Sequence, residues 1–340
     1  MRRHYLDYNA TAPLRPEARE AMLAAMDISG NPSSVHGEGR HAKALVERAR
    51  VQVAAGVGCQ PQEIVFTSGA TEAAGVLANW PGAVRVQATA HDAVFAHAED
   101  GDGPEILAMG LANSETGVLS DPPKGHAGAL LLDVTQAIGR VPFSFAWSGA
   151  DLAICSAHKL GGPKGVGALI VKQGVDISAL SLGGGQEMGR RSGTENIIGI
   201  AGFGAAVEAA QRDLEAGVWA RVEKLRNILE TILVNSVEGL TFVGKEGPRL
   251  PNTSCIIAPG WKGETQVMAM DLAGFAISAG SACSSGKVRT SRVLTSMGFD
   301  ATEAASAIRV SLGPDTTEEM ITRFAETWAR QYERHRARAA

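Results

Sequence analysis

The chain has 340 residues, of which 45% are hydrophobic and 20% are charged. This length and composition allow a large buried core and indicate two domains rather than one. The net charge of −4 comes from acidic and basic residues spread along the sequence, which argues against nucleic acid or an anionic membrane as a primary partner.

The cysteines and histidines indicate neither a disulfide framework nor a metal site. The four cysteines are far apart and form no C-x-x-C pair. The histidine spacings place no two ring nitrogens on one helical face, so we expect no metal. No long uncharged apolar run follows the basic start or occurs later. We therefore expect a protein of the reducing cytoplasm that does not enter a membrane.

In chain order, the first expected elements are helices at residues 13–26 and 40–56, where alanine, leucine and valine recur at helical spacing. The run from Glu63 to Phe66 predicts a strand, and the small residues from Thr67 to Ala74 predict a turn into a helix. Such a turn can bind an anion, because backbone N–H groups and the helix dipole favour negative charge. The Thr71 hydroxyl would add a donor, although the same sequence also serves as a plain helix cap.

Further strands are expected at residues 83–89, 106–109, 129–132 and 150–155, and polar residues follow them. Short apolar runs that alternate with helical patterns predict a parallel sheet covered on both faces, and such sheets bind ligands at the carboxyl ends of their strands. Taken singly, each polar residue is better explained as a helix cap or a satisfied core group. Their recurrence predicts a ligand site that contains Thr71, His91, Asn113, Asp133, Gln136 and Ser156 to Lys159.

Lys159 is the residue on which this site depends. It ends the segment Ser156-Ala157-His158-Lys159, between an expected strand and the glycine-rich stretch 160–167. A lysine at such a turn can form a Schiff base with an aldehyde cofactor when its amine is desolvated or when its neighbours lower its pKa. Ser156 and His158 would then hydrogen-bond the phosphate of the cofactor. An isolated loop lysine is usually only a surface residue, and the polar strand ends around Lys159 favour the catalytic interpretation.

The second half of the chain predicts a smaller unit. The loop from Gly189 to Asn196 is polar and glycine-rich, as binding or interface loops are. Residues 197–236 predict two long helices, and strands are expected at residues 240–243, 253–258 and 307–312, before a closing helix at 316–336. We expect an α/β fold with a mostly parallel sheet sandwiched by helices in a large domain, residues 13–236. Residues 1–12 and 237–340 would form a small α+β domain.

Cys283 differs from the other three cysteines in its surroundings. It lies among small residues from Ser278 to Lys287, which predict an accessible and reactive thiol. Cys59, Cys155 and Cys255 lie in or beside apolar segments, where cysteine usually behaves as a small hydrophobic residue.

Taken together, these motifs resemble the pyridoxal-phosphate-dependent cysteine desulfurases, in the class V group of the aspartate-aminotransferase fold. The similarity extends over nearly the whole chain. The residues that carry it are Tyr5 to Thr11, Gly30 to Ser34, Thr67 to Ala73, Ser156 to Lys159, Gly189 to Thr194, Gly280 to Ser285 and Arg309 to Gly313.

The resemblance implies pyridoxal 5'-phosphate as the cofactor, held covalently by Lys159. Asp133 would pair with the ring nitrogen, so that the ring acts as an electron sink. Catalysis would depend on Lys159, Cys283 and His91, with His91 stacked on the ring. The remaining implied contacts are Gln136 and Asn113 at the phenolic oxygen, Ala70, Thr71, Ser156 and His158 at the phosphate, Thr194 at the phosphate of a neighbouring subunit, and Asn113 and Arg309 at the substrate carboxylate.

The implied activity is the conversion of L-cysteine to L-alanine, with the sulfur transferred to Cys283 as a persulfide and then to an acceptor protein. Iron–sulfur cluster assembly or a thiolation pathway would use that sulfur, and the position of Thr194 implies a homodimer. Three alternatives stay open: a selenocysteine lyase, another class V enzyme such as an aminotransferase, and a non-catalytic sulfur-transfer scaffold. The accessible Cys283 argues against an aminotransferase, and the retention of Lys159, Asp133 and Arg309 argues against a silent scaffold.

The chain also departs from the family pattern. The stretches from Thr71 to His91 and from His91 to Asn113 are shorter than the family implies, and Ala74-Gly75 and Ser114 replace asparagines. We expect a helix, and a strand with it, to be missing from the large domain, with every proposed chemical group retained.

Overall fold

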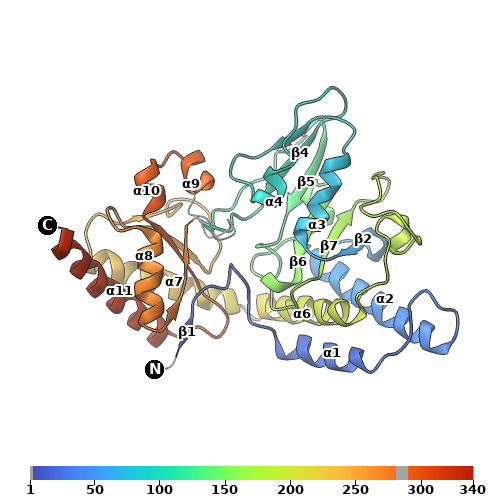
Figure 1. Cartoon of the computed structure of the whole chain (residues 1–340), viewed down its shortest axis with the longest axis horizontal. Helices are drawn as coiled ribbons and strands as arrows, with labels where there is room; N and C mark the ends of the chain where they lie inside the picture. The colour runs from blue at the N-terminus through green and yellow to red at the C-terminus, as the bar shows by residue number, and fades with distance from the viewer. Residues whose placement is uncertain (1–2, 281–289, 340) are drawn as a thin grey trace. The chain divides into compact units, whose positions relative to one another are not determined.

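The computed structural model of the protein describes residues 3–280 and 290–339 (Figure 1). The chain divides into two compact units. We call residues 11–112 and 120–216 the sheet unit, and residues 1–10, 113–119 and 217–340 the C-terminal unit.

A six-stranded sheet forms the centre of the sheet unit, in the order β2-β7-β6-β5-β4-β3. Strands β3 to β6 are parallel, whereas β7 is antiparallel to both β6 and β2. Strand β2 therefore runs in the same direction as β3 to β6, and the carboxyl ends of these five strands lie at one edge. The predicted mostly parallel sheet is confirmed. The strands are β2 (Ile64–Thr67), β3 (Val84–Val86), β4 (Ile106–Gly110), β5 (Ala129–Asp133), β6 (Leu152–Ser156) and β7 (Gly167–Val171).

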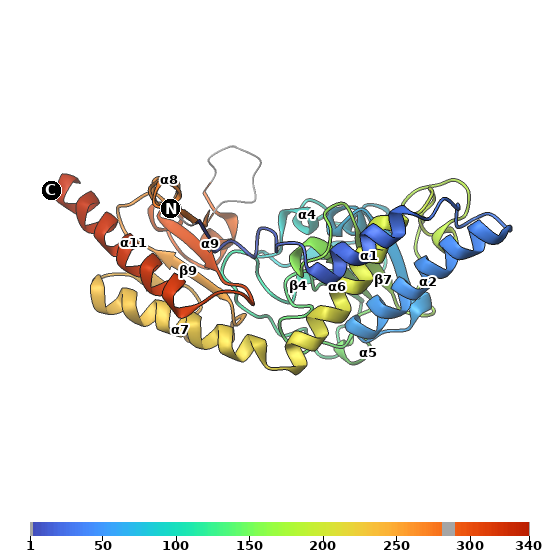
Figure 2. The ribbon, with the colours of Figure 1, turned by 90° about the horizontal axis from the view of Figure 1, so that it is seen from below.

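Helices cover both faces of this sheet, as the alternation of side chains along β2 shows. Val65 packs in a buried cluster with residues of the segments that follow β2 and β3, whereas Phe66 on the opposite face contacts Phe203 edge to face. Helices α1, α2 and α6 pack together along the Phe203 side (Figure 2). The helical segments of the sheet unit are α1 (Pro16–Met26), α2 (Gly37–Val57), α3 (Ala70–Ala74), α4 (Asp92–Phe95), α5 (Phe145–Ser148) and α6 (Ile197–Glu215), with the 3-10 turns η1 (Pro61–Glu63), η2 (Gly75–Asn79), η3 (Ala157–Lys159) and η4 (Glu187–Gly189).

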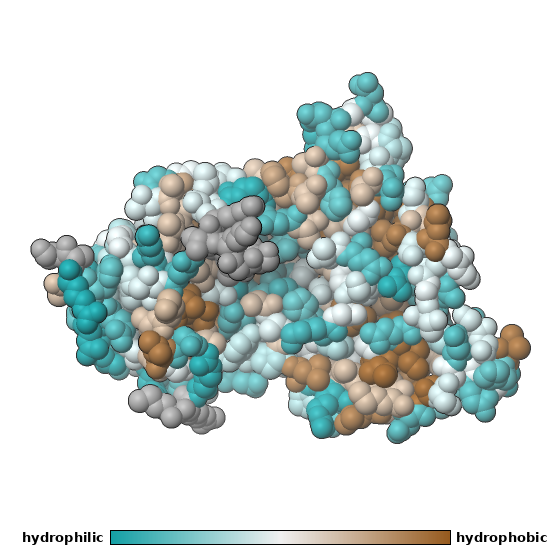
Figure 3. All heavy atoms as spheres, viewed as in Figure 1, coloured by the Kyte–Doolittle hydropathy of each residue, from teal (hydrophilic) through white to brown (hydrophobic). Residues whose placement is uncertain are grey.

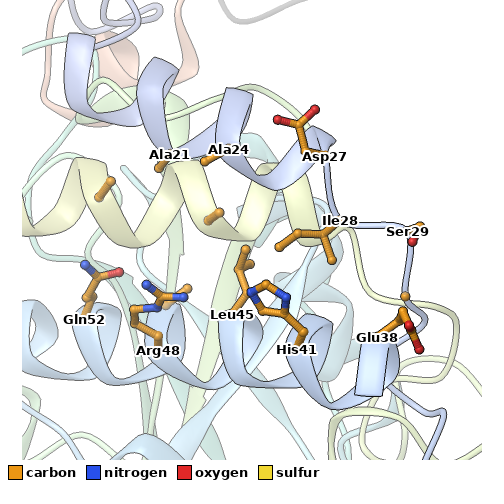
Figure 4. Close-up of a pocket in the computed structure, with 14 residues that line it drawn as sticks. Ala21, Ala24, Asp27, Ile28, Ser29, Glu38, His41, Leu45, Arg48 and Gln52 are labelled. Atoms are coloured by element: carbon orange, nitrogen blue, oxygen red, sulfur yellow. The ribbon is translucent and has the colours of Figure 1, made fainter. Parts of the chain in front are cut away.

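The packing of α1, α2 and α6 leaves a pocket of about 430 Å³ near the end of α1. Ile28 and Leu45 face each other across it (Figure 4). Hydrophobic residues also gather on the surface over α1 and α6 (Figure 3), and they include the partly exposed Leu23 and Met26. None of the predicted site residues lines this pocket.

The C-terminal unit is built on a four-stranded sheet in the order β11-β12-β9-β8, and β12 is antiparallel to both of its neighbours. Helix α7 packs against both α11 and β9. A separate parallel pair joins β1 to β10. No helix in the described part of the chain is long and apolar enough to cross a membrane. The elements are β1 (His4–Tyr5), α7 (Val218–Ser236), β8 (Thr241–Phe242), β9 (Thr253–Ile257), α8 (Gly263–Leu272), β10 (Phe275–Ala276), β11 (Ser278–Ala279), α9 (Arg292–Ser296), α10 (Ala301–Ala305), β12 (Ala307–Ser311) and α11 (Glu318–Ala339).

Apart from residues 11 and 12, which belong to the sheet unit, these units differ from the predicted division at residues 13–236 in two places. Helix α7 belongs to the C-terminal unit, because its Glu230 forms a buried ion pair with Arg249 and accepts a hydrogen bond from Ser254. The segment Asn113–Leu119 also belongs there, since the Leu250 N–H donates to the Gly117 carbonyl at 2.7 Å. Both assignments depend on contacts between residues that are distant in the sequence.

Candidate active site

The carboxyl edge of the large sheet carries most of the predicted site. Asp133 and Ser156 are the last residues of β5 and β6, and Lys159 ends the turn η3 directly after β6. Thr71 lies in α3, which follows β2, and His91 caps the amino end of α4 after β3. The structure therefore brings to one edge of the sheet unit Ala70, Thr71, His91, Asp133, Gln136, Ser156, His158 and Lys159. Asn113 and Arg309 belong to the C-terminal unit.

The backbone around Lys159 is fixed by hydrogen bonds on both sides. The His158 carbonyl accepts from the Ala12 N–H at 2.8 Å, and its ring Nδ1 lies 3.2 Å from Thr11 Oγ1. Burial lowers the pKa of His158 to about 4, and the positive charges of Lys159 and Lys164 act in the same direction. His158 is therefore neutral near pH 7 and adds no positive charge beside Lys159.

Arg140 is a part of the site that the sequence did not predict. Its side chain is buried, and its Nη1 donates to Gln136 Oε1 at 2.6 Å while its Nη2 donates to the Lys159 carbonyl at 2.7 Å. One guanidinium thus fixes the side chain of Gln136 and the backbone of Lys159 together. The spacing of four residues between Gln136 and Arg140 was the only sequence signal for this contact.

Asp133 and His91 are oriented by the local backbone. Asp133 Oδ1 accepts from the Thr135 N–H at 2.9 Å, and His91 Nδ1 accepts from the Ala93 N–H at 3.1 Å. Asp133 is partly buried and His91 is exposed. Each side chain is therefore held through at least one polar atom just beyond or at the end of a strand.

The turn after β2 is shaped to receive an anion. Gly167 at the start of β7 has no room for a side chain, because a Cβ there would lie 2.5 Å from the Cys155 carbonyl oxygen and 2.7 Å from Gly69 Cα. On the other side of Gly69, a Cβ would meet only Ser156 Oγ, at 3.7 Å. The glycines thus allow close approach of the backbone beside the Ser156 hydroxyl. This turn and the neutral His158 fit a phosphate, while Lys159 and Asp133 fit an aldehyde with a basic ring nitrogen.

Asn113 has a clear structural function within the C-terminal unit. Its Oδ1 accepts from the backbone N–H groups of Glu115 and Thr116, both at 2.9 Å, and from the Thr116 hydroxyl at 3.1 Å. The side-chain oxygen of Asn113 therefore shapes its own loop. Its predicted contacts with a phenolic oxygen and a substrate carboxylate stay predictions.

Arg309 lies at the centre of β12, and its side chain is only 3% exposed. Its Nη2 donates to Asp7 at 2.8 Å and to Ser278 Oγ at 3.1 Å, and its Nη1 donates to the Ser114 carbonyl at 3.0 Å. The Nε is buried and has no hydrogen-bond partner among the residues that the structure describes. Three of its five N–H groups are thus engaged within the described residues, which leaves the Nε–H and one Nη1–H for a ligand such as a carboxylate.

Of the two remaining predicted residues, one lies within the described residues and the other does not. Thr194 is exposed in the loop before α6. Cys283 lies outside the described residues. The three described cysteines are free thiols. Burial raises the pKa of Cys59 and Cys255 to about 12, and it also raises the pKa of Cys155. Such thiols are poor nucleophiles at neutral pH.

Known proteins resemble this chain over nearly its whole length. Residues 4–100 and 87–324 match the family model of the class V aminotransferases. A cysteine desulfurase of Frankia sp. (strain EuIK1) is 42% identical, across 96% of this chain and 90% of that protein, and one of Cereibacter sphaeroides is 39% identical, across 96% and 95%. The Frankia alignment extends over 382 residues, which exceeds the 340 of this chain, and so agrees with the shortened segments.

The fold is also that of solved structures. The NifS-like protein from Rickettsia africae ESF-5 superimposes with a TM-score of 0.90 at 31% identity, and the match covers 97% of this chain and 99% of that one. This similarity confirms the predicted α/β fold.

Proposed function

Because this chain belongs to the class V aminotransferase family, we propose that it is a pyridoxal-phosphate-dependent cysteine desulfurase that converts L-cysteine to L-alanine. The observation that carries the proposal is the Lys159 turn at the carboxyl edge of the sheet, where His158 is neutral, the buried Arg140 binds the Lys159 carbonyl and Asp133 ends the neighbouring strand β5. The names of relatives at 42% and 39% identity support the same activity.

Each residue of this edge has a proposed task toward the cofactor. Lys159 would hold pyridoxal phosphate through its amine, Asp133 would keep a proton at the ring nitrogen, and His91 would lie against the ring. The phosphate would be bound by Ala70, Thr71, Ser156 and His158, with Gln136 at the phenolic oxygen and Asn113 beside it. When bound, the cofactor supplies an electron sink for the substrate α-carbon.

The remaining steps belong to the side chains. The Lys159 amine would remove the α-proton of the substrate and return a proton later, and Arg309 would bind the substrate carboxylate. The Cys283 thiolate would attack the substrate sulfur, so that an S–S bond forms as the Cβ–S bond breaks. After protonation the carbon skeleton leaves as alanine, and Cys283 keeps the sulfur as a persulfide.

We further propose a homodimer in which Thr194 of each copy contacts the phosphate bound in the other copy. The persulfide would pass to an acceptor protein of iron–sulfur cluster assembly or of thiolation. The free thiols of Cys59, Cys155 and Cys255 support a reducing, cytoplasmic setting.

The test is to load the protein with pyridoxal phosphate and to compare wild type, Lys159→Ala and Lys164→Ala. Lys164 is an exposed lysine of the same segment and serves as the matched control. We expect wild type and Lys164→Ala to form alanine from L-cysteine and Lys159→Ala to form none. Borohydride should attach the cofactor to Lys159, as mass spectrometry of the peptides would show. Attachment elsewhere, or alanine from Lys159→Ala, would refute the proposal.

A further inference from the structure

Strand β2 is the outermost strand of the large sheet, and side chains satisfy two of its backbone groups on the open side. The Ile64 carbonyl accepts from Arg50 Nη1 at 2.8 Å, and the Phe66 N–H donates to Glu187 at 2.8 Å. Beyond the end of the strand, the Ser68 N–H donates to Glu72 at 2.6 Å. Three alternating backbone groups thus bind charged side chains where a neighbouring strand would otherwise pair.

These charged groups form two arginine–carboxylate pairs, which we call the clamp. Arg50 of α2 binds Glu187 through two hydrogen bonds of 2.8 Å, and the two side chains are 7% and 2% exposed. The Arg50 guanidinium also stacks on the Phe66 ring at 4.8 Å. The removal of one partner from such a buried pair leaves an uncompensated charge, so the pair strongly favours one position of Glu187.

The second pair joins the same loop to the turn after β2. Arg191 Nε donates to Glu72 Oε1 at 2.8 Å, and both side chains are about a quarter exposed. Glu72 follows Thr71 directly, and Arg191 precedes Thr194 by three residues. The loop therefore supplies Glu187 and Arg191 to the clamp. Their partners are Arg50 of α2 and Glu72 of α3.

The loop at residues 180–194 has a fixed conformation of its own, and near its end the Gly193 N–H donates to Gln186 Oε1 at 3.0 Å. The Leu180 N–H donates to the Arg190 carbonyl at 2.8 Å, and the Ser192 N–H donates to the Ser181 carbonyl at 3.0 Å. Glu187 and Met188 adopt φ angles of 49° and 59°, which are unfavourable for residues other than glycine. Such strain persists where surrounding contacts determine the backbone, and it clusters at functional sites.

Several side chains of this loop are exposed, although Glu187 and Arg191 hold the loop to α2 and α3. Leu182 is 89% exposed and Met188 is 54% exposed, and Thr194 is also exposed. Figure 1 shows the loop in yellow-green beside β2. A rigid loop that presents a hydroxyl and apolar side chains outward is suited to contact a second molecule.

We propose that the clamp is a positioning device, which holds Thr194 for the phosphate of a cofactor bound in a second copy of this chain. Arg50, Glu187, Glu72 and Arg191 are positioning residues in this account, since they touch the loop and not the ligand. The inference rests on the proposed function, because it requires pyridoxal phosphate at Lys159.

The first experiment compares the dissociation constants of pyridoxal phosphate and of pyridoxal, which lacks the phosphate, for the apo protein. The visible absorbance that develops when the aldehyde binds reports both constants. Arg191→Met should weaken the binding of pyridoxal phosphate about tenfold and leave that of pyridoxal unchanged. Arg212→Met, which breaks an exposed ion pair with Glu17 on the same unit, is the matched control and should change neither.

If Arg191→Met lost equal affinity for pyridoxal phosphate and for pyridoxal, or lost affinity for neither, the clamp would be only structural. If Arg191→Met does not fold, as thermal unfolding of the apo protein would reveal, Arg191→Lys replaces it in the same comparison, because lysine keeps the charge without the planar donor geometry. A wild-type protein that binds no pyridoxal phosphate would refute the proposed function, which is a different result.

The second experiment asks which copy the clamp serves. Two differently tagged chains are co-expressed, and mixed dimers are isolated through both tags. In the first mixed dimer, one chain carries Arg191→Met and the other carries Lys159→Ala. Lys159 is then present only in the Arg191→Met chain, and the loop that reaches its cofactor comes from the other chain and is intact. Pyridoxal phosphate should therefore bind with wild-type affinity. In the second mixed dimer, one chain carries both Arg191→Met and Lys159→Ala and the other chain is wild type. Lys159 is then present only in the wild-type chain, whose cofactor is reached by the altered loop, so the affinity for pyridoxal phosphate should fall about tenfold. The reverse pattern, or the absence of mixed dimers, would overturn the proposal.

Discussion

The guanidinium of Arg309 is almost completely buried, and its neighbours already use part of its donor capacity. Asp7 accepts from Nη2 at 2.8 Å and also accepts from the Ser278 hydroxyl at 2.8 Å. The Asp7 carboxylate thereby fixes the plane of the guanidinium and compensates its charge. The Nε–H and one Nη1–H, which have no partner within the described chain, are the donors that remain for a substrate.

We expect Arg309→Lys to raise the KM for L-cysteine about thirtyfold with a smaller effect on kcat, because an ammonium cannot reproduce the planar contact with a carboxylate. This corresponds to about 2 kcal/mol of binding free energy. Steady-state kinetics would measure it, with Arg3→Lys as a control, since Arg3 forms an exposed ion pair with Asp271 in the same unit. An unchanged KM would mean that Arg309 serves only as the ionic partner of Asp7.

At the scale of elements, the close approach of β7 to the turn after β2 determines the shape of the predicted phosphate site. Gly167 pairs with both Thr67 of β2 and Ser156 of β6, and so it lies between the two segments that supply the phosphate ligands. The absence of a side chain at Gly167 allows Gly69 to lie close to β7. Strand β7 therefore contributes to the predicted phosphate site through the backbone of Gly167 alone.

We expect Gly167→Ala to lower the free energy of unfolding of the apo protein by about 2 kcal/mol, because the new methyl group would overlap the Cys155 carbonyl and Gly69. The affinity for pyridoxal phosphate should also fall. Urea unfolding and absorbance titration would measure the two effects. Gly37→Ala is the control, because a Cβ at Gly37 has no atom within 4 Å. Equal stability of the two variants would contradict the packing argument.

The sequence predicted most strands of the large sheet but not β7. Strands β4, β5 and β6 are short apolar runs followed by polar residues, and this pattern is local. Strand β7 follows a glycine-rich stretch, and its antiparallel position between β2 and β6 depends on pairing between distant residues. For the same reason Arg140 was not predicted, since nothing in the sequence relates it to the Lys159 carbonyl.

At the scale of the whole molecule, the proposed groups are divided between the two units. Lys159, Asp133 and the phosphate turn belong to the sheet unit, whereas Arg309 belongs to the C-terminal unit. The resemblance in sequence predicted these residues but not the assignment of Asn113–Leu119 and α7 to the C-terminal unit, because tertiary contacts determine it. Cofactor chemistry and substrate binding can therefore be altered separately by substitution.

The central claim joins cofactor chemistry at Lys159 to sulfur transfer at Cys283, and one measurement tests both. The protein loaded with pyridoxal phosphate is mixed with L-cysteine in the absence of thiols and acceptor proteins, and alanine and protein-bound sulfur are quantified after a single turnover. We predict one alanine for each sulfur atom added, with mass spectrometry locating the added sulfur on Cys283, and no added sulfur in Cys283→Ala. Alanine without sulfur on Cys283, or wild-type sulfur release from Cys283→Ala, would contradict the account.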